Sequence, residues 1–440
     1  MYWALLLVVV CTCSIKADVL RVCAQCQVQS VEDAVARAQA GDTIFIESGL
    51  YRNTHATISK SLIIIGRNRP VLDGDGRGTV LTISGASVHI RGIVIANTGY
   101  SAVEDRAGIL LLDSYNSTIQ DVATQHCAFG VILYRSANCR VENINAIGTG
   151  AKESQSGNGI HLWKSPSCTV VQCNIRQHRD GLYFEFSRGC NIAECISTNN
   201  MRYGLHFMFS DSNVYRKNRF EQNGAGVAVM YSQHVRMESN IFADNWGPSS
   251  YGLLLKDISR STVFGNVFRS NTVGIYMEGS NQTTIVANIF HSNGWALKAL
   301  GSCSDDTVCS NDFIANTFDV LSNTSSSEFY CDGNYWEQYR GYDLDHDGYG
   351  DVPYRPVSVF SILVERIPMA VLLLRSFIVE LLAYMERAIP SLIPVQLVDR
   401  KPCMMPIATK TTRNQYRWKV SSMCLSTHGI GVYERRADGH

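Results

Sequence analysis

The chain has 440 residues, with 39 basic and 39 acidic side chains, so its formal net charge is zero. Balanced charge creates no overall field toward nucleic acid or an anionic surface, and we expect no nucleic-acid partner. The length alone allows either two or three ordinary domains or one long repeat protein.

The amino-terminal segment has the pattern of an exported protein. Residues 5–10 are continuously apolar, and Ala17 stands where a cleavage site requires a small residue. A lipoprotein would need a small residue before Cys11, where Val10 stands instead. We predict that residues 1–17 are a cleavable signal peptide.

Residues 31–39 have helical spacing and precede an alternating, strand-like segment. An open end of a solenoid exposes apolar core and unpaired strand edges, so a covering element is needed there. The pattern predicts a helix that caps the first coil.

Glycine then recurs at intervals of 22, 29, 22, 23, 22, 26 and 22 residues, at Gly108, Gly130, Gly159, Gly181, Gly204, Gly226, Gly252 and Gly274. The longer intervals contain insertions that belong in loops. The repeat predicts an all-β fold, a right-handed parallel β-helix over residues 18–340 with about 22 residues per coil.

Two further columns contain asparagine. Fourteen places after the glycine stand Asn218, Asn240, Asn266 and Asn288, each followed two places later by Phe220, Phe242, Phe268 or Phe290. Nineteen places after it stand Asn200, Asn223, Asn245, Asn271 and Asn293. Stacked amides can hydrogen-bond between coils at the ~4.8 Å strand spacing, so we interpret both columns as structural ladders.

Cysteines also recur at the same position in successive coils. Cys168 and Cys190 share one column, and Cys173 and Cys195 share another, so each pair is predicted on adjacent coils. Strand spacing suits a disulfide, and buried thiols would also pack well, so both alternatives stand. A lone CxxC at Cys23 is a weak signal for a redox or metal site.

Residues one and three places after the glycine are apolar and should point into the core, so residues two and four places after it should point outward. We name eight of these outward residues the outward strip: Tyr134, His161, Trp163, Tyr183, Glu185, His206, Met208 and Met230. Exposed aromatic, imidazole and thioether groups together predict a protein interface or a surface for a soft metal.

Imidazole and thioether ligands suit Cu(I) better than calcium or magnesium. His206 and Met208 should lie about 7 Å apart on one strand, with Met230 one coil along. His161 lies two coils from His206, roughly 10 Å, which fits a relay better than shared coordination. The alternative is a sheet face covered by a partner, in which these side chains only pack. His178 occupies an asparagine column and is predicted to cap that ladder.

Residues 341–356 contain an acidic loop, with Asp343, Asp345, Asp347 and Asp351 around Gly348. Alternating oxygen ligands and a turn glycine match the first nine places of a calcium loop, although Tyr354 stands where an EF-hand has glutamate. We predict a structural calcium loop, with a solvated acidic turn as the alternative.

The repeat pattern ends before residues 357–406, and this segment has a different distribution of apolar residues. Residues 372–385 have the period of an amphipathic helix, and Arg375 and Glu380 interrupt any run long enough to span a membrane. We predict a helical docking segment, which either packs on the last coil or binds a membrane-embedded partner. Residues 407–440 are expected to be an irregular tail.

Five segments carry a resemblance to a known family: GNGIHLWKS, HRDGLYFEFS, MRYGLHFMFSDSN, NYWEQYRGYDLDHDGYGDVPYRP and VDRKPCMMP. In this order they resemble the NosD family, β-helix proteins of nitrous oxide reductase maturation, over about residues 20–406. The resemblance implies a periplasmic accessory protein, not an enzyme, that supports assembly of the reductase copper centre. It also implies an ABC-type ATPase and membrane subunit and a copper-chaperone lipoprotein as partners.

With this resemblance, the outward strip is expected to receive the chaperone or the apo-reductase. Tyr134, Trp163, Tyr183 and Glu185 are the candidates for partner binding, and His206, Met208, Met230 and His161 are those for transient copper contact. A second hypothesis is a lyase, hydrolase or epimerase acting on uronate polysaccharides. Such an enzyme needs clustered carboxylates, but Glu185 and Glu278 should lie four coils apart. A third is a binding scaffold without metal.

Overall fold

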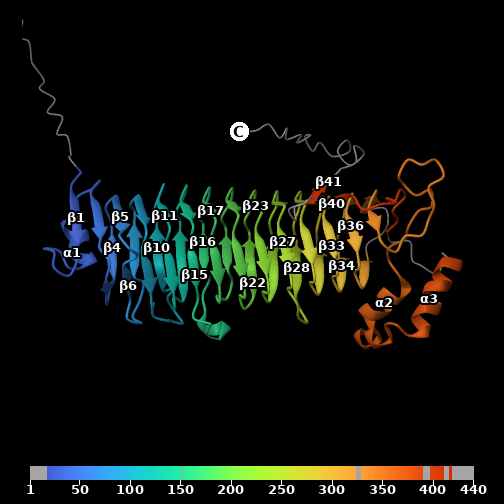
Figure 1. Cartoon of the computed structure of the whole chain (residues 1–440), viewed down its shortest axis with the longest axis horizontal. Helices are drawn as coiled ribbons and strands as arrows, with labels where there is room; N and C mark the ends of the chain where they lie inside the picture. Colours follow the sequence, from blue (N-terminus) through green and yellow to red (C-terminus); the bar gives the residue numbers. More distant parts are fainter. Residues whose placement is uncertain (1–16, 151, 324–328, 390–396, 411–415, 419–440) are drawn as a thin grey trace, which may run out of the picture.

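The computed structural model describes residues 17–150, 152–323, 329–389, 397–410 and 416–418. The predicted signal peptide, apart from its last residue, lies outside these ranges. The described chain forms an elongated parallel β-helix with helices at both ends (Figure 1). The predicted fold class is confirmed.

Three parallel sheets run along the solenoid, and each coil adds one strand to each sheet. Sheet A contains β1 Val19–Val22, β2 Thr43–Ile46, β5 Leu62–Gly66, β8 Val88–Arg91, β11 Thr118–Gln120, β14 Arg140–Glu142, β17 Thr169–Val171, β20 Asn191–Ala193, β23 Val214–Arg216, β26 Arg236–Glu238, β29 Thr262–Phe264, β32 Thr284–Val286, β35 Asp306–Cys309 and β38 Phe329–Asp332. Sheet B contains β3 Leu50–Tyr51, β6 Val71–Asp73, β9 Val94–Ala96, β12 Ala123–Gln125, β15 Asn145–Ile147, β18 Asn174–Arg176, β21 Ile196–Thr198, β24 Arg219–Glu221, β27 Ile241–Ala243, β30 Val267–Arg269, β33 Ile289–His291, β36 Asp312–Ile314 and β39 Tyr335–Trp336. Sheet C contains β4 Ala56–Ile58, β7 Leu81–Ser84, β10 Ala107–Leu112, β13 Phe129–Tyr134, β16 Ile160–Trp163, β19 Leu182–Glu185, β22 Tyr203–Met208, β25 Ala225–Met230, β28 Tyr251–Lys256, β31 Val273–Glu278, β34 Trp295–Leu300 and β37 Phe318–Ser322.

The glycine column lies in sheet C, where adjacent coils come too close for a side chain. A Cβ atom at Gly204 would lie 2.7 Å from the carbonyl oxygen of Gly226, and one at Gly226 would lie 2.4 Å from that of Gly252. Only glycine avoids this clash with rigid backbone. Glycine therefore recurs at the coil interval because neighbouring coils are in close backbone contact at this position.

The predicted asparagine ladders are present and buried. Asn240 donates through Nδ2 to Asn266 Oδ1 at 3.0 Å, and Asn266 donates to Asn288 Oδ1 at 3.0 Å. Each amide also donates to a carbonyl of the preceding coil, as Asn266 does to Met237 at 2.9 Å. Because these buried groups satisfy one another, the ladders hold the coils in register.

A stack of aromatic rings accompanies the ladder in the core. Phe242 and Phe268 have ring centroids 4.6 Å apart, and Phe313 stacks on Trp336 at 4.1 Å. The stack continues beyond the four phenylalanines predicted from the sequence. Burial of these rings adds to the apolar area that stabilises the solenoid.

The cysteines of the two predicted columns are free, buried thiols, which matches the second alternative above. Cys139 precedes Cys168 and Cys190 in the same column and was missed in the sequence. The Cys168 thiol donates to the Ser136 carbonyl of the previous coil at 3.4 Å. The CxxC cysteines, by contrast, form a disulfide between Cys23 and Cys26.

The amino-terminal end of the solenoid is covered by α1 (Val31–Arg37), as predicted. Ser30 caps this helix by accepting a hydrogen bond from the Asp33 amide at 3.1 Å. Val31, Ala34 and Val35 are buried against the first coils. The helix therefore shields the apolar end that an open coil would expose.

The other end is closed by a segment that returns from residue 399. The buried Asp399 carboxylate accepts hydrogen bonds from Asn334 Nδ2 at 3.1 Å, from Trp336 Nε1 at 2.8 Å and from the Gly333 amide at 3.0 Å. It occupies the place that the next asparagine of the ladder would take. The aspartate thus satisfies the last donors of the ladder.

Beyond the coils lie α2 (Val359–Arg366), the 3₁₀ helix η2 (Pro368–Leu373) and α3 (Phe377–Ala388). A short 3₁₀ helix, η1 (Glu153–Gln155), lies in the insertion after Gly148. Within the predicted tail, β40 (Ala408–Lys410) pairs with β41 (Tyr416–Trp418) in an antiparallel arrangement. The rest of 411–440 lies outside the described residues.

Candidate functional site

The outward strip lies on β13, β16, β19, β22 and β25 of sheet C. One column pairs Tyr134 with Trp163, Trp163 with Glu185, Glu185 with Met208, and Met208 with Met230. The second column pairs His161 with Tyr183 and Tyr183 with His206. The structure therefore brings all eight predicted residues together on five successive coils.

The exposure predicted for the two histidines was wrong. Their side chains point away from the core, yet His161 is only 7% exposed and His206 only 5%. The residue before each glycine also lies on this face and covers its neighbours: Phe129 stacks on His161 at 6.0 Å, and Tyr203 packs on His206 at 4.9 Å. Met208 and Met230 remain half-buried.

Tyr183 lies between the two imidazoles. Its ring centroid is 4.9 Å from that of His161 and 4.9 Å from that of His206. Its hydroxyl donates to Met208 Sδ at 3.8 Å. Tyr183 therefore links both histidines to a thioether and separates the histidines from each other.

An ion pair between the buried Asp180 and the partly exposed Arg202 adjoins His206. Arg202 donates from Nε to Asp180 Oδ1 at 2.9 Å and from Nη2 to Asp180 Oδ2 at 2.6 Å. His206 Nδ1 lies 3.7 Å from Asp180 Oδ2. Burial would raise the pKa of Asp180, but the contacts with His206 and Arg202 outweigh it and lower that pKa below its ordinary value. The carboxylate is therefore ionised.

Neither ring nitrogen of His161 or of His206 has a hydrogen-bond partner within the described part of the chain. Burial lowers the pKa of His161 from 6.5 to about 4, so this imidazole is neutral near pH 7. A buried neutral imidazole with a free lone pair is an unsatisfied group that a metal ion can satisfy. Neighbouring thioether sulfur makes the donor set soft.

His178 belongs to the interior and not to the strip. Its backbone amide donates to Asn200 Oδ1 at 3.2 Å, so it lies at the head of the ladder that the sequence predicted it to cap. The side chain is fully buried, and burial lowers its pKa to about 4. It has no place among the outward residues.

Three exposed rings beside the strip were missed in the sequence. Phe186, Phe209 and Tyr231 directly follow Glu185, Met208 and Met230, and they are 45%, 43% and 42% exposed. Their centroids are 5.2 and 5.1 Å apart, in a continuous stack. Each has a φ near +50°, which is unusual for aromatic residues. The column five places after the glycine would have revealed them.

The remaining partner-binding candidates line the first coils of the strip. The Tyr134 hydroxyl donates to Asp105, and its ring contacts Trp163 edge-on at 5.7 Å. Lys164 lies over the Trp163 ring at 4.4 Å. Glu185 and Glu278 are four coils apart in the register, as predicted, and Lys256 pairs with Glu278 at 3.6 Å.

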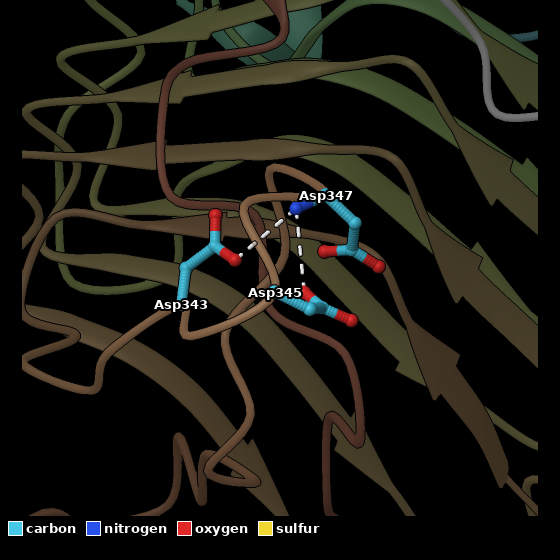
Figure 2. Close-up of side chains that lie close together, drawn as sticks. All are labelled: Asp343, Asp345 and Asp347. Atoms are coloured by element: carbon cyan, nitrogen blue, oxygen red, sulfur yellow. Dashed lines mark hydrogen bonds between the residues drawn. The ribbon is translucent and has the colours of Figure 1, made fainter.

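The acidic loop places three carboxylates close together (Figure 2). Ligand oxygens of Asp343, Asp345 and Asp347 lie within 4.8 Å of one another. Asp343 also accepts the Asp347 amide at 3.2 Å, and Asp347 accepts the Tyr349 amide at 2.8 Å. Asp351 lies outside this cluster and accepts the Leu344 amide at 2.7 Å.

The carboxyl-terminal helices only partly pack on the solenoid. Phe360 of α2 contacts Phe318 of the last sheet C strand at 6.0 Å, and Glu365 pairs with Lys298 at 2.5 Å. On η2 and α3, by contrast, Leu372 is 75% exposed and Phe377 is 76% exposed. No helix within the described ranges is long and apolar enough to cross a membrane.

Comparisons with known proteins agree with the resemblance. Residues 144–341 match the family model described as "Periplasmic copper-binding protein (NosD)". A protein of Pseudomonas aeruginosa named probable ABC transporter binding protein NosD is 28% identical over 357 residues, which cover 77% of this chain and 82% of that protein. The protein of the same name from Stutzerimonas stutzeri is 27% identical over 366 residues, covering 78% and 83%.

Among solved structures, the surface adhesin PfbA of Streptococcus pneumoniae has 13% identity and a TM-score of 0.47, covering 74% of this chain and 92% of the adhesin. These values carry no information about activity. The family match and the two named relatives, in contrast, confirm the resemblance to the NosD family that the sequence showed.

Proposed function

We propose that this chain is a periplasmic accessory protein that supports copper delivery to nitrous oxide reductase and assembly of its copper centre. In this proposal Cu(I) is cargo, held transiently on the outward strip. The observation that carries it is the buried imidazole of His206, whose ring nitrogens have no hydrogen-bond partner within the described residues, on the same strand as the half-buried Met208 thioether. Imidazole and thioether donors fit Cu(I).

The burial of the donors suggests an order of contact. Met208 and Met230 are half-buried and adjoin each other in the register, whereas the imidazole of His206 is covered by Tyr183 and Tyr203. An incoming ion therefore meets sulfur first and reaches His206 only after a ring rotates. His161, behind Tyr183, would act as a relay.

The proposal is tested by replacing His206, Met208 and Met230 together with alanine and measuring copper in the reductase that matures beside this variant. We expect the reductase to lose most of its copper. A matched control replaces Met404 and His234, which lie away from the strip. Full copper loading beside the triple variant would refute the copper role.

The partners proposed for this surface are the copper-chaperone lipoprotein and the apo-reductase. The exposed stack of Phe186, Phe209 and Tyr231 extends the aromatic surface beside the metal donors, and aromatic side chains dominate many protein interfaces. Trp163→Ala and Tyr183→Ala should weaken chaperone binding, and Tyr115→Ala, on another exposed turn, should not. Unchanged chaperone binding by both strip variants would contradict this part.

We further propose that α3 and η2 dock the chain onto the membrane subunit of an ABC-type transporter with its ATPase. The relatives carry the name of ABC transporter binding proteins, and the apolar side chains of these helices are exposed. Such a surface is typical of a binding site. Phe377→Ser with Leu381→Ser should abolish co-purification with the membrane subunit, whereas Glu380→Gln should preserve it.

The loop 341–356 is proposed to bind calcium as a structural ion. Asp343, Asp345 and Asp347 offer a cluster of oxygen ligands, and oxygen is what calcium prefers. Calcium should raise the midpoint of thermal unfolding of the wild type but not of Asp345→Ala. Equal midpoints with calcium and with chelator would refute a calcium site.

A further inference from the structure

Asp180 lies next to His206 of the outward strip, and its negative charge is neutralised. Asp180 is fully buried beside His206, and both of its oxygens accept hydrogen bonds from the guanidinium of Arg202. The arginine comes from the next coil, 22 residues later. A bidentate pair of this kind fixes both the position and the charge of the carboxylate.

The donors proposed for the metal carry no charge. A metal-binding imidazole is neutral, and the thioethers of Met208 and Met230 are neutral as well. With Asp180 and Arg202 paired, the negative charge next to His206 is compensated, and the carboxyl group of Glu185, beside Met208 in the register, is the other acidic group of the strip. Compensating the charge of Asp180 favours a monovalent soft ion, because a divalent ion gains more from negative charge and from oxygen ligands.

We propose that Arg202 makes this site selective for Cu(I) over divalent cations by neutralising Asp180. This inference rests on the proposed binding of Cu(I). Without Arg202, the Asp180 oxygen 3.7 Å from His206 Nδ1 would present a full negative charge to the site. Coulomb attraction to that charge is twice as large for a divalent ion as for a monovalent one. Arg202 is thus a specificity-determining residue and not a ligand.

The test measures binding of Cu(I) alone and of Zn(II) alone to the full-length protein by competition with chromogenic chelators. Arg202→Gln should raise the Zn(II) affinity by at least about tenfold, and the gain in log affinity for Zn(II) should be about twice that for Cu(I). The double variant Asp180→Asn/Arg202→Gln should lose the gain. Arg135→Gln is the matched control, because Arg135 forms the same bidentate pair with Asp113 away from the site.

A second variant keeps the test decisive if Arg202→Gln fails to fold. Asp180→Asn leaves the Arg202 cation without its partner, so the Cu(I) affinity should fall by about tenfold and recover in the double variant. Wild-type protein that binds no Cu(I) would refute the proposed function. Wild-type protein that binds Cu(I), with Arg202→Gln gaining no more Zn(II) affinity than the Arg135→Gln control, would refute the selectivity alone.

Discussion

The substitution His161→Phe tests whether the imidazole of His161 is buried without a hydrogen-bond partner, as the described part of the structure indicates. The imidazole of His161 packs between the rings of Phe129 and Tyr183, and neither of its nitrogens has a hydrogen-bond partner in the described ranges. Phenylalanine keeps the ring contacts and removes two unsatisfied polar atoms. We therefore expect the variant to be at least as stable as the wild type at about pH 7.5.

The size of the His161 contribution to the free energy of unfolding follows from its pH dependence. Burial lowers the pKa of His161 from 6.5 to about 4, so the unfolded chain binds a proton at this residue before the folded chain does. Stability is therefore lost as the pH falls from about 6.5 toward 4. Between about pH 7.5 and pH 5 the contribution of His161 falls by about 2 kcal/mol.

The assay is urea unfolding of the wild type and of His161→Phe at those two pH values. The free energy of unfolding of the wild type should fall by about 2 kcal/mol more than that of the variant. His234→Asn, which changes an exposed histidine, should leave the pH dependence as it is in the wild type. An equal pH dependence in His161→Phe, or a destabilised variant at about pH 7.5, would show that the imidazole has a partner and would refute the reasoning.

Three further predictions concern the ladders and the exposed rings. Asn266→Ala removes the oxygen that accepts from two buried donors of Asn240, its backbone amide and its Nδ2, and should lower the free energy of unfolding by about 2–4 kcal/mol in urea, and a loss below about 1 kcal/mol would contradict the ladder. Asp399→Ala removes the acceptor of Trp336 and should speed amide hydrogen exchange in the last coil, so unchanged exchange there would count against the closing role of Asp399. Phe209→Ala should change the unfolding free energy by less than about 1 kcal/mol but weaken binding of the copper chaperone, and undiminished binding would remove the aromatic stack from the interface.

The coil architecture could be predicted because its causes recur through most of the successive coils. The glycine at Gly204 and its equivalents records a backbone contact, and the amides of Asn240 and Asn266 record a hydrogen bond to the next coil. Asp399 could not be predicted in the same way. It completes the ladder from a segment 65 residues beyond Asn334 and follows no period.

The residues of the candidate site were predicted better than their environment. Alternation from the glycine placed His206 and Met208 on the outer face correctly, but it ignored the residue before each glycine. Tyr203 occupies that position and covers His206. Asp180 occupies it one coil earlier, but its partner Arg202 lies two places before Gly204, so column arithmetic alone would not have paired the two residues.

Direct titration of Cu(I) into the purified protein, with and without the copper chaperone, tests the central claim. Competition with a chelator gives the stoichiometry and affinity for the wild type and for Met208→Leu/Met230→Leu. The account predicts a single Cu(I) ion per chain of the wild type, accepted also from the loaded chaperone, and loss of this binding in the double variant. Equal stoichiometry and affinity in the two proteins, or no binding by the wild type, would contradict it.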